Sequence, residues 1–90
     1  MDEKKEARMP EKDVVAFEYE GAEYEADAAA LRDYAVIKAV TRADSDPAGF
    51  FGAMERVFMG RDEEYAAQTG GVGGIAELFS AAAEAANAKN

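Results

Sequence analysis

The amino-acid sequence predicts an α+β fold that is mainly α-helical, with an N-terminal β-hairpin followed by three to four helices. Two observations lead to this fold class. Residues 14–26 alternate apolar and polar side chains around a glycine, which is the period of half-buried strands. From residue 27 onward, apolar side chains recur at helical spacing between residues that typically cap helices.

The chain has the size of one domain, since it is 90 residues long. Its composition, 49% hydrophobic and 32% charged, is typical of a folded globular domain. Residues 1–13 are dominated by charged side chains and show no apolar period, so we expect a mobile charged tail. Residues 14–90 are then expected to form a single helical domain that begins with the hairpin.

The turn of the predicted hairpin is centred on Gly21. If Glu20 and Gly21 are the two-residue loop, the apolar side chains of both strands lie on one face. On the other face Glu18 lies opposite Glu23, and like charges in that position are destabilising. The turn type therefore stays open. The expected cross-strand pairs of the apolar face are Tyr19–Ala22, Phe17–Tyr24 and Val15–Ala26.

Capping residues predict the first three helices. Asp27 is a good N-cap for a helix running to about residue 41, and Asp46 followed by Pro47 starts a second helix running to residue 59. Acidic residues at 62–64 predict a short third helix through residue 68. The apolar residues of the second helix have the spacing of a core-facing stripe: Phe50, Phe51, Met54, Val57 and Phe58.

The last helix is predicted over residues 75–88, after a glycine-rich run at 70–74 that we expect to act as a flexible joint. Its apolar stripe packs either into the core or against another protein. In the second case Phe79 is the expected anchor in a partner's groove. The candidate protein-binding residues are Ile75, Leu78, Phe79, Ala82 and Ala86.

Composition argues against several classes of function. The chain has no cysteine and no histidine, which disfavours zinc, haem and iron–sulfur sites as well as thiol or histidine-assisted catalysis. We therefore predict no catalytic residue, metal site or cofactor, and no enzymatic activity. The net charge of −9 disfavours nucleic-acid binding. No apolar run is long enough to span a membrane, so we expect a soluble cytoplasmic protein.

The order of the predicted elements resembles the order found in a known protein family. A hairpin over residues 17–24 leads into an Asp-capped helix, and the Asp46-Pro47 helix is followed by an acidic turn at 62–65. The closing helix begins Ile75-Ala76-Glu77-Leu78-Phe79. In this order, and in its size and acidity, the chain resembles the tail assembly chaperones of long-tailed bacteriophages and prophages over roughly residues 14–88.

This resemblance implies a protein that binds the tape measure protein in the bacterial cytoplasm and helps recruit subunits of the tail tube protein. A homo-oligomer is a separate expectation, because oligomerisation would supply burial that so short a chain lacks. The alternative is an acidic DNA mimic or an adaptor that inhibits or bridges a host or phage protein. Its candidate surface is the acidic segment 18–27, which contains no basic residue. Salt discriminates between the two, since binding by a mimic weakens steeply as salt rises.

Overall fold

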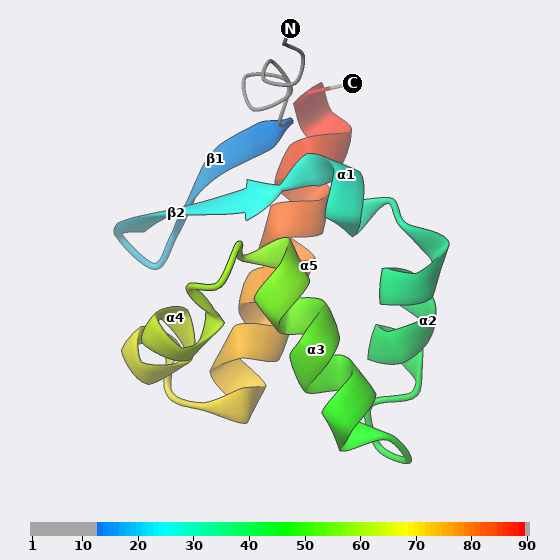
Figure 1. Ribbon diagram of the computed structural model, residues 1–90. Helices are drawn as coiled ribbons and strands as arrows, with labels where there is room; N and C mark the ends of the chain where they lie inside the picture. The colour runs from blue at the N-terminus through cyan, green and yellow to red at the C-terminus, as the bar shows by residue number, and fades with distance from the viewer. Residues whose placement is uncertain (1–12, 90) are drawn as a thin grey trace, which may run out of the picture.

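The computed structural model describes residues 13–89, and the side chains of residues 13–87. In that part of the chain a two-stranded antiparallel hairpin is followed by five helices (Figure 1). The last helix runs through the middle of the molecule and contacts the hairpin and three other helices. The predicted mainly helical α+β class is confirmed. The predicted mobile tail lies outside the described residues, except for Asp13.

The hairpin has the predicted register. Strands β1 (Val14–Tyr19) and β2 (Ala22–Asp27) pair Phe17 with Tyr24 and Val15 with Ala26, and all four of these side chains are buried. The turn residues Glu20 and Gly21 both have positive φ, 52° and 86°. These left-handed conformations are those of a type I′ turn, whose twist matches that of the two strands. Glutamate therefore accepts a conformation that it rarely adopts.

A hydrogen bond ties the hairpin to the central helix. The Tyr19 hydroxyl donates to Glu77 Oε1 at 2.6 Å. Because this bond needs the phenol proton, it raises the pKa of Tyr19 from 10.0 to about 12. At pH values below the ordinary pKa of tyrosine, the bond therefore makes its full contribution to the stability of the folded state. Its contribution is lost as the pH rises from about 10 to about 12.

We expect Glu77→Ala to bring the ionisation of one tyrosine back toward its ordinary pKa, because the carboxylate acceptor is removed. The measurement is tyrosinate absorbance between about pH 9 and about pH 12, with circular dichroism to verify the fold. Tyr19→Phe is the control, since it removes the late-titrating group altogether. An unchanged titration curve in Glu77→Ala would contradict the assigned contact.

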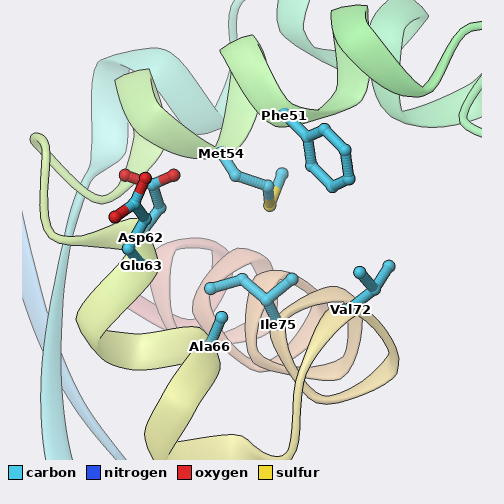
Figure 2. Close-up of a pocket in the computed structure, with 7 residues that line it drawn as sticks. All are labelled: Phe51, Met54, Asp62, Glu63, Ala66, Val72 and Ile75. Carbon is cyan, nitrogen blue, oxygen red and sulfur yellow. The ribbon is translucent and has the colours of Figure 1, made fainter.

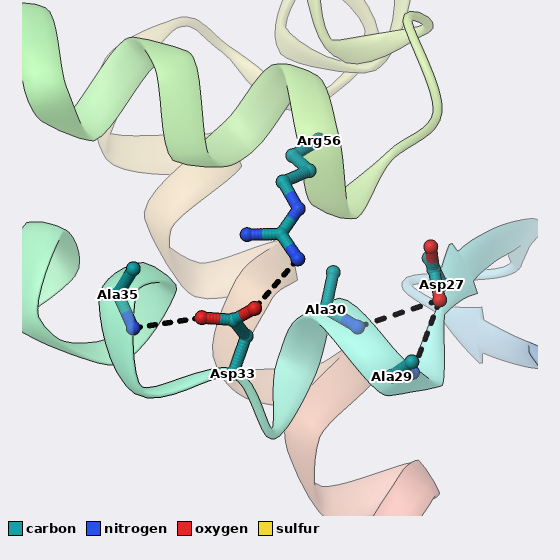
Figure 3. Close-up of polar contacts among 6 residues, drawn as sticks. All are labelled: Asp27, Ala29, Ala30, Asp33, Ala35 and Arg56. Atoms are coloured by element: carbon teal, nitrogen blue, oxygen red, sulfur yellow. Dashed lines mark hydrogen bonds and ion pairs between the residues drawn. The ribbon is translucent and has the colours of Figure 1, made fainter.

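The chain after the hairpin forms two helices where the sequence predicted one. Helix α1 (Ala28–Leu31) is capped by Asp27, whose carboxylate accepts from the N–H of Ala29 at 3.0 Å. A break follows, and α2 (Tyr34–Thr41) starts from a second cap at Asp33 (Figure 3). The prediction of one continuous helix to residue 41 was wrong, because Asp33 takes an extended backbone conformation at the break.

Asp33 also connects α2 to the next helix. One carboxylate oxygen accepts from the Ala35 N–H at 2.8 Å, and the other from the Arg56 guanidinium at 2.6 Å (Figure 3). The Arg56 bond, followed by the Ala35 bond, lowers the pKa of Asp33 below its ordinary value. The stabilisation is therefore present above the ordinary pKa of aspartate. It is lost as the pH falls through the lowered pKa of the folded state.

Helix α3 (Pro47–Val57) begins as predicted, with the Asp46 carboxylate accepting from the Gly49 N–H at 3.2 Å. It ends two residues before the predicted position. Met59 and Gly60 have left-handed φ values of 58° and 84°, which a helix cannot continue through. Helix α4 (Asp62–Thr69) follows, close to its predicted range of 62–68.

Residues 70–74 form a tight turn and the start of a helix. They do not form the flexible joint that was predicted from this glycine-rich run. Gly70 and Gly71 have φ values of 101° and 102°, and both donate their N–H to the Ala66 carbonyl oxygen. Helix α5 (Val72–Lys89) starts directly after them, three residues earlier than predicted. Gly73 and Gly74 therefore belong to its first turn.

The core of the domain contains a cluster of aromatic rings around Tyr65 of α4. Its ring packs edge-on against Tyr24 of the hairpin at 4.8 Å between centroids, and against Phe58 at 5.4 Å. Its hydroxyl accepts from the Glu25 N–H at 3.3 Å. Edge-to-face pairs are a favoured arrangement of aromatic side chains. This cluster fixes α4 against the hairpin and thereby positions the N-terminal turn of α4.

Within residues 13–89, none of the helices combines the length and the apolar character needed to cross a lipid bilayer.

Candidate protein-binding groove

The stripe proposed from the sequence as a partner surface lies mostly inside the domain. Ile75, Leu78, Ala82 and Ala86 are buried, and Leu78 and Ala82 have no exposed surface at all. Phe79 is partly buried against the core. Leu78 and Ala82 thus cannot contact a partner while this fold is kept, whereas Ile75 and Ala86 each line a hollow of the surface. Their stripe faces inward because α5 is the element against which the hairpin, α1, α3 and α4 pack.

An open apolar groove lies instead where α3, α4 and the first turns of α5 meet (Figure 2). We call it the α3–α5 groove, and its volume is about 270 Å³. Its floor is buried apolar surface from Met54 and Ile75. Two large apolar side chains on its rim face solvent, since Phe51 is 49% and Val72 is 58% exposed. The lining residues are Phe51, Met54, Asp62, Glu63, Ala66, Val72 and Ile75.

The rim of the α3–α5 groove is held by structure beneath it. The Phe51 ring packs edge-on against Phe50 at 5.8 Å between centroids, and Phe50 is buried. Val72 is the first residue of α5, directly after the two glycines of the tight turn. Both exposed side chains therefore stand on backbone that the core keeps in place, which reduces the entropy lost when a partner binds.

Charge is distributed unevenly along this groove. The carboxylates of Asp62 and Glu63 lie at one end, and Phe51 and Val72 at the other (Figure 2). Among the residues that the structure describes, no basic side chain lines the groove. The third acid of the same helical turn, Glu64, pairs instead with Arg61 at 3.4 Å. The α3–α5 groove thus combines an apolar surface with an acidic end.

A second hollow, the α1–α5 groove, lies on another part of α5 and has a volume of about 430 Å³. It is where Phe79 is found, together with Ile37 of α2, which is 46% exposed. Arg32 at its edge pairs with Asp13 at 3.3 Å. Within residues 13–87, no carboxylate lines this hollow. Its lining residues are Leu31, Arg32, Ile37, Phe79, Ala83, Ala86 and Asn87.

The side chains of the α3–α5 groove suit burial of apolar surface better than bond-making chemistry. Five of the seven lining residues are apolar, and the other two are carboxylates at one end. A pair of carboxylates without a neighbouring nucleophile or proton-transfer partner is a weak candidate for catalysis. In the described part of the chain, no three acidic residues cluster closely enough to hold a metal ion.

Sequence reasoning missed Phe51 and Val72 as surface residues. Phe50 and Phe51 are adjacent in one helix and point about 100° apart, so at least one of them lies toward the edge of the core-facing stripe. That adjacency was the available signal, although it does not say which of the two is buried. Val72 was interpreted as part of a joint. Its exposure follows from the early start of α5, for which the sequence carries no clear mark.

Comparison with protein-family models, with curated proteins and with solved structures finds no match to this chain.

Proposed function

We propose that this protein is a tail assembly chaperone of a long-tailed phage or prophage, and that it holds apolar helical segments of the tape measure protein. The observation that carries the proposal is the α3–α5 groove, with Phe51 and Val72 about half exposed on a rigid rim. Exposed apolar side chains that gather at one groove are typical of binding surfaces, whereas single ones are common on any protein. The resemblance in element order supplies the identity of the client.

The charge of the chain fits this role. A chaperone must stay dissolved while it covers apolar surface, and the net charge of −9 provides repulsion between free copies. Binding through a groove also leaves the charged outer faces of the domain in water. Tail tube protein is a second expected partner, through surfaces that the client does not cover.

The direct test is co-expression with the tape measure protein of the same phage or prophage. We expect the wild-type chaperone to move the tape measure protein into the soluble fraction and to co-purify with it. Phe51→Asp should reduce the co-purified amount about tenfold, because it places a charge on the apolar rim. Unchanged circular dichroism would show that the variant is folded.

Tyr34→Asp is the matched control, since Tyr34 is an aromatic residue that is 76% exposed and lines neither groove. It should bind the client as wild type does. If the tape measure protein stays insoluble with the wild-type chaperone, the proposed function is wrong. If Phe51→Asp binds the client as well as Tyr34→Asp does, the client occupies a different surface.

The DNA-mimic alternative is supported by one observation, the outer face of the hairpin. Glu18 and Glu23 are paired across the strands there, and both are exposed with Glu25 nearby. However, Arg61 shares a shallow hollow with Glu23 and Glu25, so a cation interrupts the acidic surface. Mimicry needs carboxylates without such interruption, which makes the chaperone the better-supported function.

A further inference from the structure

The acidic end of the α3–α5 groove needs an explanation beyond helix stability. Acids in a first helical turn interact favourably with the helix dipole, and α4 has Asp62, Glu63 and Glu64 there. This effect accounts for all three equally. It does not explain why two of them line an otherwise apolar groove while Glu64 pairs with Arg61. The position of Asp62 and Glu63 is therefore informative about what the groove binds.

The size and walls of the groove restrict its occupant. Its volume of about 270 Å³ is close to that of the smallest small-molecule sites, which usually have about 300–1,000 Å³. All lining residues belong to helices, so the groove offers no free strand edge to an extended peptide. A few side chains presented by a helix match both features, as in helix-in-groove recognition.

The two carboxylates of the groove then favour one kind of partner helix over others. A second copy of this chain would bring a net charge of −9 to a groove that already has two carboxylates. A helix with basic residues beside its apolar face would instead bring cations to the acidic end as its apolar residues reach Phe51 and Val72. Opposite charges at the rim favour the correct partner and the correct orientation.

We infer that the α3–α5 groove docks an amphipathic helix bordered by lysine or arginine, with Asp62 and Glu63 as the residues that select for the basic border. This inference rests on the proposed client-binding function and names the client segment by its chemistry. The apolar residues of the helix, spaced i, i+3, i+4 and i+7, contact Phe51, Met54 and Val72. Its basic residues lie within reach of the two carboxylates.

The test uses two synthetic helical peptides with the same leucine face, one bordered by lysine and the other by glutamate. Fluorescence anisotropy gives their dissociation constants with the full chain at about 50 mM and about 500 mM salt. We expect wild type to bind the lysine-bordered peptide about tenfold more tightly at low salt, with a smaller preference at high salt. Phe51→Asp should weaken binding of both peptides.

The decisive variant is Asp62→Asn combined with Glu63→Gln, which should remove most of the preference while leaving apolar binding in place. Glu64→Gln is the matched control, because it removes a charge from the same helical turn but not from the groove. It should keep the wild-type preference. Thermal melts of both variants separate a loss of helix stability from a loss of selectivity.

Three results would overturn the inference: binding of neither peptide, a preference that survives in the Asp62→Asn/Glu63→Gln variant, or self-association through the groove that Phe51→Asp abolishes. The co-expression experiment with the tape measure protein tests the proposed function, not this inference. If the lysine-bordered peptide binds through Asp62 and Glu63 but the tape measure protein does not, the groove assignment stands and the tail chaperone function falls.

Discussion

We expect Leu78→Asp to unfold the domain. Leu78 has no exposed surface and lies in the N-terminal half of α5, the helix against which the hairpin and three other helices pack. A carboxylate there would be buried without a partner. The cost should exceed about 4 kcal/mol, which approaches the whole stability of many small domains. Far-UV circular dichroism and urea denaturation measure the effect.

The contrast between Leu78→Asp and Phe51→Asp separates core from binding surface. Both changes replace a large apolar side chain by the same charge, but Phe51 is about half exposed. Phe51→Asp should therefore keep the circular dichroism spectrum and a cooperative melt. A folded Leu78→Asp protein would mean that the apolar stripe of α5 is available to a partner after all.

The second large effect is expected for Gly74→Ala. A methyl group on Gly74 would overlap the carbonyl oxygen of Thr69, the last residue of α4. Because the obstacle is backbone, it cannot be relieved by a side-chain rotation. The tight turn between α4 and α5 would have to open. We expect a loss of at least about 2 kcal/mol in the free energy of unfolding, measured by urea denaturation.

Gly73→Ala is the matched control for this prediction. The neighbouring glycine lies in the same helical turn, yet a methyl group there would meet nothing within 4 Å. Alanine favours helix over glycine, so Gly73→Ala should be neutral or stabilise the domain by roughly 0.5–1 kcal/mol. If both substitutions destabilise the domain equally, the assigned close approach of Gly74 in α5 to the Thr69 backbone is contradicted.

Gly74→Ala should also weaken binding at the α3–α5 groove. Gly74 lies between Val72 of the rim and Ile75 of the floor, so any opening of the turn moves both. The same purified variant can be used in the peptide titrations, where it should bind both peptides less tightly than Gly73→Ala does. The turn thus links the stability of the domain to the shape of its candidate site.

Local signals in the sequence determined much of the secondary structure. The register of the hairpin follows from alternation around Gly21, because a shift of one residue would turn Phe17 and Tyr24 to solvent. The starts of α1 and α3 follow from Asp27 and Asp46, whose carboxylates bond N–H groups only two or three residues away. Interactions of such short range need no knowledge of the remaining chain.

Only the tertiary structure decided where the helical segment after the hairpin is interrupted and which apolar residues face solvent. The break before α2 is supported by Arg56, 23 residues away from Asp33 in the chain. Helical spacing marks Ile75 and Leu78 as a stripe, but it cannot say whether that stripe meets a neighbour of the same chain or another protein. The neighbours that cover one face of a helix come from distant segments. For this reason the sequence placed the candidate site on the apolar stripe of α5 that begins at Ile75, whereas the packing of α3, α4 and α5 leaves Phe51 and Val72 exposed.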